Sequence, residues 1–213
     1  HIEHKSYIGG RYSVLSEVGM VPAYLMGINI LKLRKNLLNH FKARNRNYLK
    51  DSSSKLASIL QRKKLNNLIF FNYVPQLNKF LYWNQQLIAE SLGKKGKGFL
   101  PVVSSAPRDH HSLLQLYLDG PKDKLFYVFS SDTNNKSLNR IKIAQKNAFL
   151  KVLKKKRIPF REFKIGDISE KALGELFSYF ILETVIVGKI ANINPFNQPA
   201  VEELKVYSKK ILY

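Results

Sequence analysis

Residues 67–74 read Asn-Leu-Ile-Phe-Phe-Asn-Tyr-Val, and this stretch decides the fold class of the chain. It is an apolar run without the polar–apolar alternation of a strand that has one face in water. Such a run predicts a strand covered on both faces, as in a parallel sheet. Residues 99–104 and 124–130 have a similar strand character, whereas residues 160–165 alternate as an edge strand does.

Helical patterns lie between these strands and on both sides of them. We predict helices over residues 22–42, 52–64, 76–91, 109–118, 138–156, 169–189 and 198–212. Gly93 and Gly120 end two of these helices, and Asp109 is predicted to cap another. Because strands and helices alternate with short connections, the sequence predicts an α/β fold. We expect a three-layer α/β/α sandwich with a mainly parallel sheet, plus C-terminal helices.

Composition narrows the function classes. The 213 residues carry 36 Lys and Arg against 15 Asp and Glu, a formal charge of +21, with 45% hydrophobic residues. This is enough apolar material for the core of one domain, so intrinsic disorder is excluded. The absence of cysteine excludes disulfides, thiolate zinc sites and cysteine nucleophiles. The most apolar stretch, residues 18–31, is too short to span a bilayer. The charge leaves polyanions and small anionic metabolites as partner classes.

Four segments carry residues suited to chemistry. They are residues 6–19 with Gly-Gly-Arg, residues 85–101 with Glu-Ser-Leu-Gly-Lys, residues 109–121 with Asp-His-His-Ser, and residues 194–205 with Asn-Pro-Phe-Asn-Gln-Pro. In order and spacing they resemble the second half of the glucose-6-phosphate isomerase family, over nearly the whole chain. The resemblance implies one C-terminal sugar-isomerase (SIS) domain, flavodoxin-like, over residues 1–213. Its leading segment would cover about residues 1–20 and its C-terminal helical arm about residues 190–213.

The resemblance also implies an activity in glycolysis and gluconeogenesis, in the cytoplasm. The family interconverts glucose 6-phosphate and fructose 6-phosphate through a cis-enediol(ate), without a metal or an organic cofactor. It places the proton-transferring base at Glu90, the ring-opening histidine at His111 and a group that assists at the ring oxygen at Lys205. Arg11 would stabilise negative charge on the intermediate. The residues that would help bind the sugar phosphate are Gln86, Gln198 and Gly10.

The residue types suit this chemistry on physical grounds. Proton transfer between adjacent carbons needs a positioned base, and Gln86 and Glu90 are four residues apart on one helix face. Arg11 follows two glycines that let the backbone approach a ligand, and a guanidinium suits an oxyanion. Gln198 and Lys205 are seven residues apart, so we expect them to share a face of the last helix.

Two positions depart from the family pattern. His110 stands where Gln usually precedes the catalytic histidine, and Ala200 stands where most members have Gly. Adjacent residues of a helix point in different directions, so His110 and His111 are not expected to bind a metal together. Glu202 offers Lys205 an ordinary salt bridge as an alternative to a catalytic role.

The predicted strand at residues 99–104 separates two of the candidate catalytic residues. Glu90 ends the helix before this strand and His111 begins the helix after it. A strand of six residues spans about 20 Å, so we predict that the two side chains lie far apart in one chain. His111 would then serve the site of a neighbouring subunit in a homodimer, in agreement with the family's shared active site.

The family's main phosphate-binding loop belongs to an N-terminal sugar-isomerase domain that we expect to be absent from this chain. We therefore expect the isolated chain to bind substrate poorly and to be weakly active or inactive. A first residue of His1 rather than Met favours truncation over a tag remnant at residues 1–4.

Three alternative interpretations compete with this one. A non-catalytic sugar-phosphate-binding SIS domain would need no base, so the joint presence of Glu90, His111, Lys205 and Arg11 argues against it. A nucleic-acid binder is suggested by the basic residues 138–157, but these cations lie opposite an apolar stripe and are expected to form a solvated face. Residues 93–98, Gly-Lys-Lys-Gly-Lys-Gly, lack the ending of a phosphate-binding loop and are expected to be a solvated basic loop.

Overall fold

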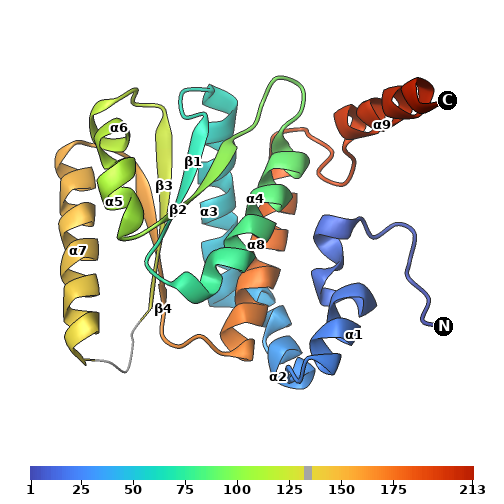
Figure 1. Cartoon of the computed structure of the whole chain (residues 1–213), viewed down its shortest axis with the longest axis horizontal. Coiled ribbons are helices and arrows are strands. Elements are labelled where there is room, and N and C mark those ends of the chain that lie inside the picture. The colour runs from blue at the N-terminus through green and yellow to red at the C-terminus, as the bar shows by residue number, and fades with distance from the viewer. Residues whose placement is uncertain (132–135) are drawn as a thin grey trace.

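The computed structural model of the chain describes residues 1–131 and 136–213. Within this part, four parallel strands form one sheet in the order β2-β1-β3-β4 (Figure 1). The strands are β1 Asn67–Asn72, β2 Leu100–Ser105, β3 Lys124–Ser131 and β4 Phe160–Ile165. The apolar run at residues 67–72 is therefore an inner strand, with β2 and β3 as its neighbours. The edge position predicted for residues 160–165 is confirmed.

Helices cover both faces of the sheet (Figure 1). One face carries α3 Ala43–Arg62, α4 Asn78–Leu92 and α8 Glu170–Ile190. The other face carries α5 Arg108–Ser112, α6 Leu114–Asp119 and α7 Lys136–Lys155. The predicted three-layer α/β/α architecture is confirmed.

The two cores follow from the pleat of the strands, because successive side chains point to opposite faces. Phe70 and Phe129 pack with α8 on one face, whereas Phe71 and Phe126 pack with α7 on the other. All four rings have 0% exposure. Each buried ring of this size contributes about 1.5–3 kcal/mol, so both faces of the inner strands stabilise the sheet.

The predicted helix over residues 22–42 is wrong. The structure has three short pieces there: α1 Glu17–Leu25, α2 Ile30–Arg34 and the 3-10 helix η2 Leu37–Phe41. Gly27 has a φ of 82° and turns the chain out of the first helix, and the side chain of Asn29 caps the next by accepting a hydrogen bond from the Lys32 amide. The helix predicted to begin at Ser52 begins instead at Ala43, so the serine cluster lies inside α3.

The predicted cap at Asp109 is also wrong. The helix begins at Arg108 and breaks at Leu113, so Asp109 lies in its first turn. Its carboxylate accepts hydrogen bonds from the Ser105 amide at 2.8 Å and the Ser112 hydroxyl at 3.1 Å. The hydrogen bond from Arg108 holds the pKa of Asp109 at about 2. Asp109 thereby ties the end of β2 to α5.

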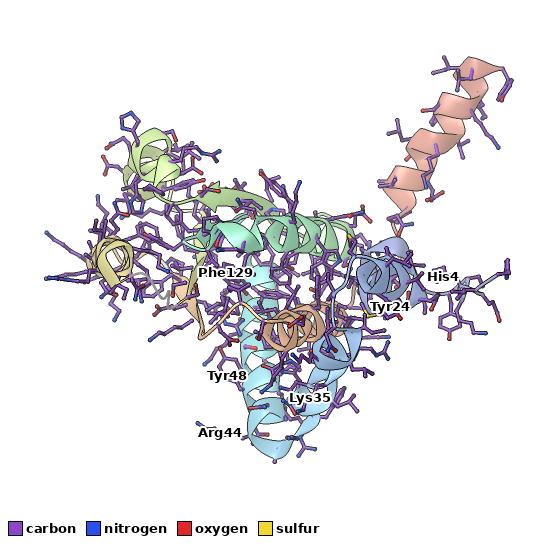
Figure 2. All side chains as sticks on the ribbon, turned by 60° about the horizontal axis from the view of Figure 1, so that its bottom comes forward. His4, Tyr24, Lys35, Arg44, Tyr48 and Phe129 are labelled. Atoms are coloured by element: carbon purple, nitrogen blue, oxygen red, sulfur yellow. The ribbon has the colours of Figure 1, made fainter. Side chains whose placement is uncertain are left out.

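The last helix, α9 Pro199–Leu212, projects from the body of the molecule. Figure 2 shows it as the pale red ribbon at the upper right, and each of its residues is exposed. Among the residues that the structure describes, no helix is long and apolar enough to cross a membrane.

Candidate active site

Arg11 is the centre of a buried cluster at the end of α4. It belongs to the 3-10 helix η1 Gly10–Leu15 and is only 3% exposed. Its guanidinium donates five hydrogen bonds of 2.7–3.1 Å, which engages each of its N–H groups. The acceptors are the Ser91 hydroxyl, the Glu90 carboxylate, the Gln198 side chain and the carbonyls of Pro195 and Asn197.

The cluster joins three segments that are far apart in the sequence. The Trp83 ring of α4 donates to the Arg11 carbonyl at 3.0 Å, and the Tyr12 hydroxyl donates to the Pro195 carbonyl at 2.9 Å. The Tyr12 and Ser91 hydroxyls are also within hydrogen-bond distance of each other, at 2.8 Å. Because an unpaired buried charge is costly, this network explains how a guanidinium can lie below the surface.

Glu90 is held at both oxygens. Its Oε2 accepts from Arg11 Nη1 at 3.1 Å, and its Oε1 accepts from Gln86 Nε2 at 2.9 Å. The contact with Gln86 confirms the i, i+4 placement on one face of α4. The Glu90 side chain is 28% exposed, so the oriented carboxylate still reaches solvent. An oriented, accessible carboxylate has the geometry of a general base.

Glu90 and Gln198 open onto a groove of about 920 Å³. The end of α4, residues 93–100 and residues 193–201 line it. This volume lies in the range of small-molecule sites, about 300–1,000 Å³. The oriented carboxylate is therefore on the wall of a space large enough for a metabolite.

Gly9 and Gly10 lie next to this cluster, before Arg11. A Cβ atom at either position would meet nothing within 4 Å, and neither residue has a positive φ. Packing within the chain therefore does not require glycine here. The open space is consistent with close approach of a ligand to the backbone.

The basic loop at residues 93–98 differs from the solvated loop that the sequence predicts. Three of its lysines donate to backbone carbonyls just beyond α8 at 2.7–3.2 Å. The pairs are Lys94 with Asn194, Lys95 with Asn192, and Lys97 with Ala191. Helix C-termini leave carbonyls without partners and favour cations, which explains the lysines. The loop therefore fixes the segment that carries Gln198.

Lys94 is a site residue that sequence reasoning missed. Its ammonium group also donates to the Ser91 carbonyl at 2.9 Å and lines the groove. Burial and the charge of Arg11 lower the pKa of Lys94 to about 8, although Glu90 acts in the opposite direction. The one signal in the sequence was its position four residues after Glu90.

His111 does not join the cluster. It is exposed on α5, which follows the carboxyl end of β2, whereas Glu90 precedes the amino end of that strand. Six strand residues, about 20 Å, separate these two ends. Its neighbour His110 is turned inward instead: its ring stacks on Phe71 with centroids 5.3 Å apart, and Nε2 is 2.7 Å from the Tyr73 hydroxyl.

Lys205 does not join the cluster either. It is exposed on α9 and its ammonium group pairs with Glu202 at 2.8 Å, the salt bridge named above as the alternative. The expectation that Gln198 and Lys205 share a helix face is wrong. Pro199 is the first helical residue, and Gln198 precedes it with φ −147° and ψ 68°. Gln198 is therefore free to turn toward Arg11.

The described part of the chain has no group of three or more His, Asp and Glu residues that could hold a metal ion. Of the predicted site residues, the structure brings together Arg11, Gln86, Glu90 and Gln198, with Gly10 adjacent to Arg11. It leaves His111 and Lys205 elsewhere on the surface.

No family model matches the chain. Among curated proteins, it is 33% identical to glucose-6-phosphate isomerase of Methanocaldococcus jannaschii, over 93% of this chain and 54% of that protein. It is 35% identical to the enzyme of the same name from Mycoplasmopsis pulmonis, over 96% of this chain and 54% of that protein. It is 32% identical to glucose-6-phosphate isomerase of Campylobacter jejuni, over 96% of this chain and 56% of that protein. The chain thus spans about half the length of the curated relatives it matches.

Solved structures agree with the fold. A hypothetical protein from Thermus thermophilus superposes with a TM-score of 0.81 at 25% identity, over 96% of this chain and 55% of that one. A glucose-6-phosphate isomerase from Chlamydia trachomatis superposes with the same TM-score at 19% identity, over 99% of this chain and 48% of that one. This similarity shows the shared fold. Over most of its length, the chain is therefore homologous to glucose-6-phosphate isomerases, of which it matches about one half.

Proposed function

We propose that this chain is the part of a glucose-6-phosphate isomerase that carries the proton-transferring carboxylate, Glu90. The observation that supports this most strongly is the arrangement around that carboxylate. Arg11 and Gln86 each hold one of its oxygens, and the group lies on the wall of a groove of about 920 Å³. A sugar-phosphate binder without catalysis would have no need for an oriented base at this place.

The reaction moves one proton between two adjacent carbons of the open-chain sugar. Glu90 takes the proton from C2 of the aldose, and the C–H electron pair forms the C1–C2 double bond while negative charge develops on the carbonyl oxygen. The same group then returns the proton to C1 while the proton of the C2 hydroxyl passes to the C1 oxygen, which leaves a ketone at C2 and a hydroxyl at C1. One base suffices because the proton leaves C2 and returns to C1 on the same face of the planar cis-enediolate.

Arg11 is suited to the charge that develops in this step. Its Nη1 divides its two N–H groups between Glu90 and the neutral side chain of Gln198. An oxyanion is a stronger acceptor than an amide oxygen, so the developing charge can replace Gln198 at 2.7 Å without breaking the pair with Glu90. Gln198 would then turn to a hydroxyl group of the sugar.

Ring opening needs a second group, which we assign to His111 of a neighbouring subunit. We expect a homodimer in which α5 of one subunit reaches the groove of the other, and in which Lys205 assists at the ring oxygen. The phosphate would be bound mainly outside this chain. The proposal includes a cytoplasmic location and no requirement for a metal or organic cofactor.

The test is Glu90→Gln in the complete enzyme. General-base catalysis contributes about 10²–10⁴-fold, so we expect the variant to lose at least about 100-fold in kcat with little change in substrate affinity. Glu203→Gln is the matched control, because Glu203 is exposed on α9 and outside the cluster. Unchanged kcat in Glu90→Gln, or equal losses in both variants, would contradict the assignment and favour a binding domain.

A further inference from the structure

A second cavity, of about 320 Å³, lies at the amino ends of the strands, before β1, β3 and β4. The connection between α3 and β1 separates it from the groove beside Glu90. Arg62, Lys64 and Leu65 face this cavity, whereas Lys63 and Asn66 face the groove. The cavity is therefore a separate site, and none of the residues that we propose for the isomerase reaction lines it.

The lining combines apolar walls with basic groups. Tyr117 and Ile158 are buried and contribute to the walls, together with Leu118, Pro121 and Pro159. Five of the lining residues are Lys or Arg and none is acidic. The basic residues are Arg62, Lys64, Lys122, Lys124 and Arg157.

Four of these five cations have no partner within the described part of the chain: Arg62, Lys64, Lys122 and Arg157 make no side-chain hydrogen bond, ion pair or ring contact there. The fifth, Lys124, is buried and donates to the Pro121 carbonyl at 2.6 Å and the Asp123 carboxylate at 2.8 Å. The charge of Lys124 is thus offset by Asp123, and the other four remain available to a ligand.

The partial negative charges at the carboxyl ends of nearby helices do not compensate these four cations. The carboxyl ends of α3, α6 and α7 lie here, and such an end carries roughly half a negative charge. Three ends supply roughly −1.5 against four uncompensated cations, which leaves an excess of roughly +2 to +3. Dianions are therefore favoured over neutral ligands or monoanions.

We propose that this cavity binds a phosphorylated ligand with a planar or apolar body, of the mononucleotide class. The phosphate would lie between Arg62 and Arg157, which are suited to bidentate contacts with its oxygens, and the body would pack against Tyr117, Pro121 and Pro159. The volume is near the lower end for small-molecule sites, about 300–1,000 Å³, so one nucleoside phosphate fits better than a dinucleotide.

The test is calorimetric titration of the full chain with AMP at low ionic strength. Adenosine is titrated separately as the part of AMP without phosphate, and inorganic phosphate as the part without the nucleoside. We expect AMP to bind more tightly than either probe. Arg62→Gln and Arg157→Asn should each weaken AMP binding about tenfold, because each removes one charge-assisted contact. Asparagine is chosen at position 157 because Arg157 has a φ of 56°, a conformation that Asn tolerates.

Arg44→Gln is the matched control. Arg44 lies near the start of α3, about 27 Å along the helix axis from Arg62, and Figure 2 shows it far from the sheet. Equal weakening by all three substitutions would indicate general attraction to a basic protein and overturn the proposal. So would the absence of AMP binding at millimolar concentration, or phosphate binding as tightly as AMP. Glu90→Gln should leave AMP binding unchanged; loss of binding there would place the nucleotide in the groove instead.

Discussion

At the scale of single residues, Arg11 determines the geometry of the site. A guanidinium offers five donors in a fixed plane, and five acceptors from two other segments, residues 90–91 and 195–198, surround it. Glu90 and Gln198 are therefore brought together by one side chain rather than by direct contact with each other. Under the proposed function, activity and stability would therefore depend on the same group.

Arg11→Lys should lower the free energy of unfolding by about 2 kcal/mol or more, because a lysine has three donors and cannot reach five acceptors. Urea denaturation measures this directly. Arg44→Gln provides the control for a lost surface charge and should change the stability by less than about 0.5 kcal/mol. Equal stabilities of wild type and Arg11→Lys would show that the network is not formed in solution.

His110 makes stability depend on pH. Its ring is stacked on Phe71, and burial lowers its pKa from the ordinary value of 6.5. The unfolded chain therefore binds a proton more readily than the folded chain as the pH falls below 6.5. The stability contributed by neutral His110 is present above that pH and is lost as the pH falls toward its folded-state pKa.

We expect the loss of Tm between pH 7 and pH 5 to be smaller in His110→Gln than in the wild type, measured by thermal unfolding at both pH values. Carboxylates titrate in both proteins, so the difference between the two losses of Tm gives the contribution of the histidine. Asp109, with a pKa of about 2, contributes only at lower pH. An identical loss of Tm in the two proteins would contradict the half-buried position of His110.

At the scale of elements, the strands could be predicted from sequence and parts of the helical layer could not. Residues 67–74 are mostly apolar and do not alternate with polar residues, and burial on both faces leaves few other structures for such a run. Residues 22–42 have a composition typical of a helix, but Gly27 ends one helix and Asn29 caps the next. The site network depends on contacts across 79 and 187 positions, which no local pattern encodes. The resemblance to the isomerase family nevertheless predicts four residues of this network.

The packing of α2 on α8 depends on Gly174. A Cβ atom there would lie 1.8 Å from the carbonyl oxygen of Leu33, so a methyl group would force the two helices apart. Gly174→Ala should destabilise the chain by about 1–3 kcal/mol, the usual cost of overpacking. Gly166 is the matched control, because a Cβ atom there meets nothing within 4 Å. Chemical denaturation compares the two variants; equal stabilities would contradict the close helix contact.

At the scale of the whole molecule, the formal charge of +21 is distributed among distinct roles. Arg11 is buried in the site, three lysines of residues 93–98 bind carbonyls beyond α8, and four cations surround the second cavity. The charge is therefore partly structural, and under the two proposals another part of it would bind small anions. Because His111 lies at the opposite end of β2 from Glu90, we propose that a complete site combines two chains.

Co-expression of Glu90→Gln and His111→Ala subunits of the complete enzyme tests this claim most directly. Each variant alone should be inactive, whereas a mixed dimer would contain one site with both residues intact. Random pairing makes half of the dimers mixed, with one of two sites restored, so we expect about a quarter of the wild-type activity. If Glu90 and His111 act within one chain, the mixture will show no more activity than the separate variants, and the shared site will be contradicted.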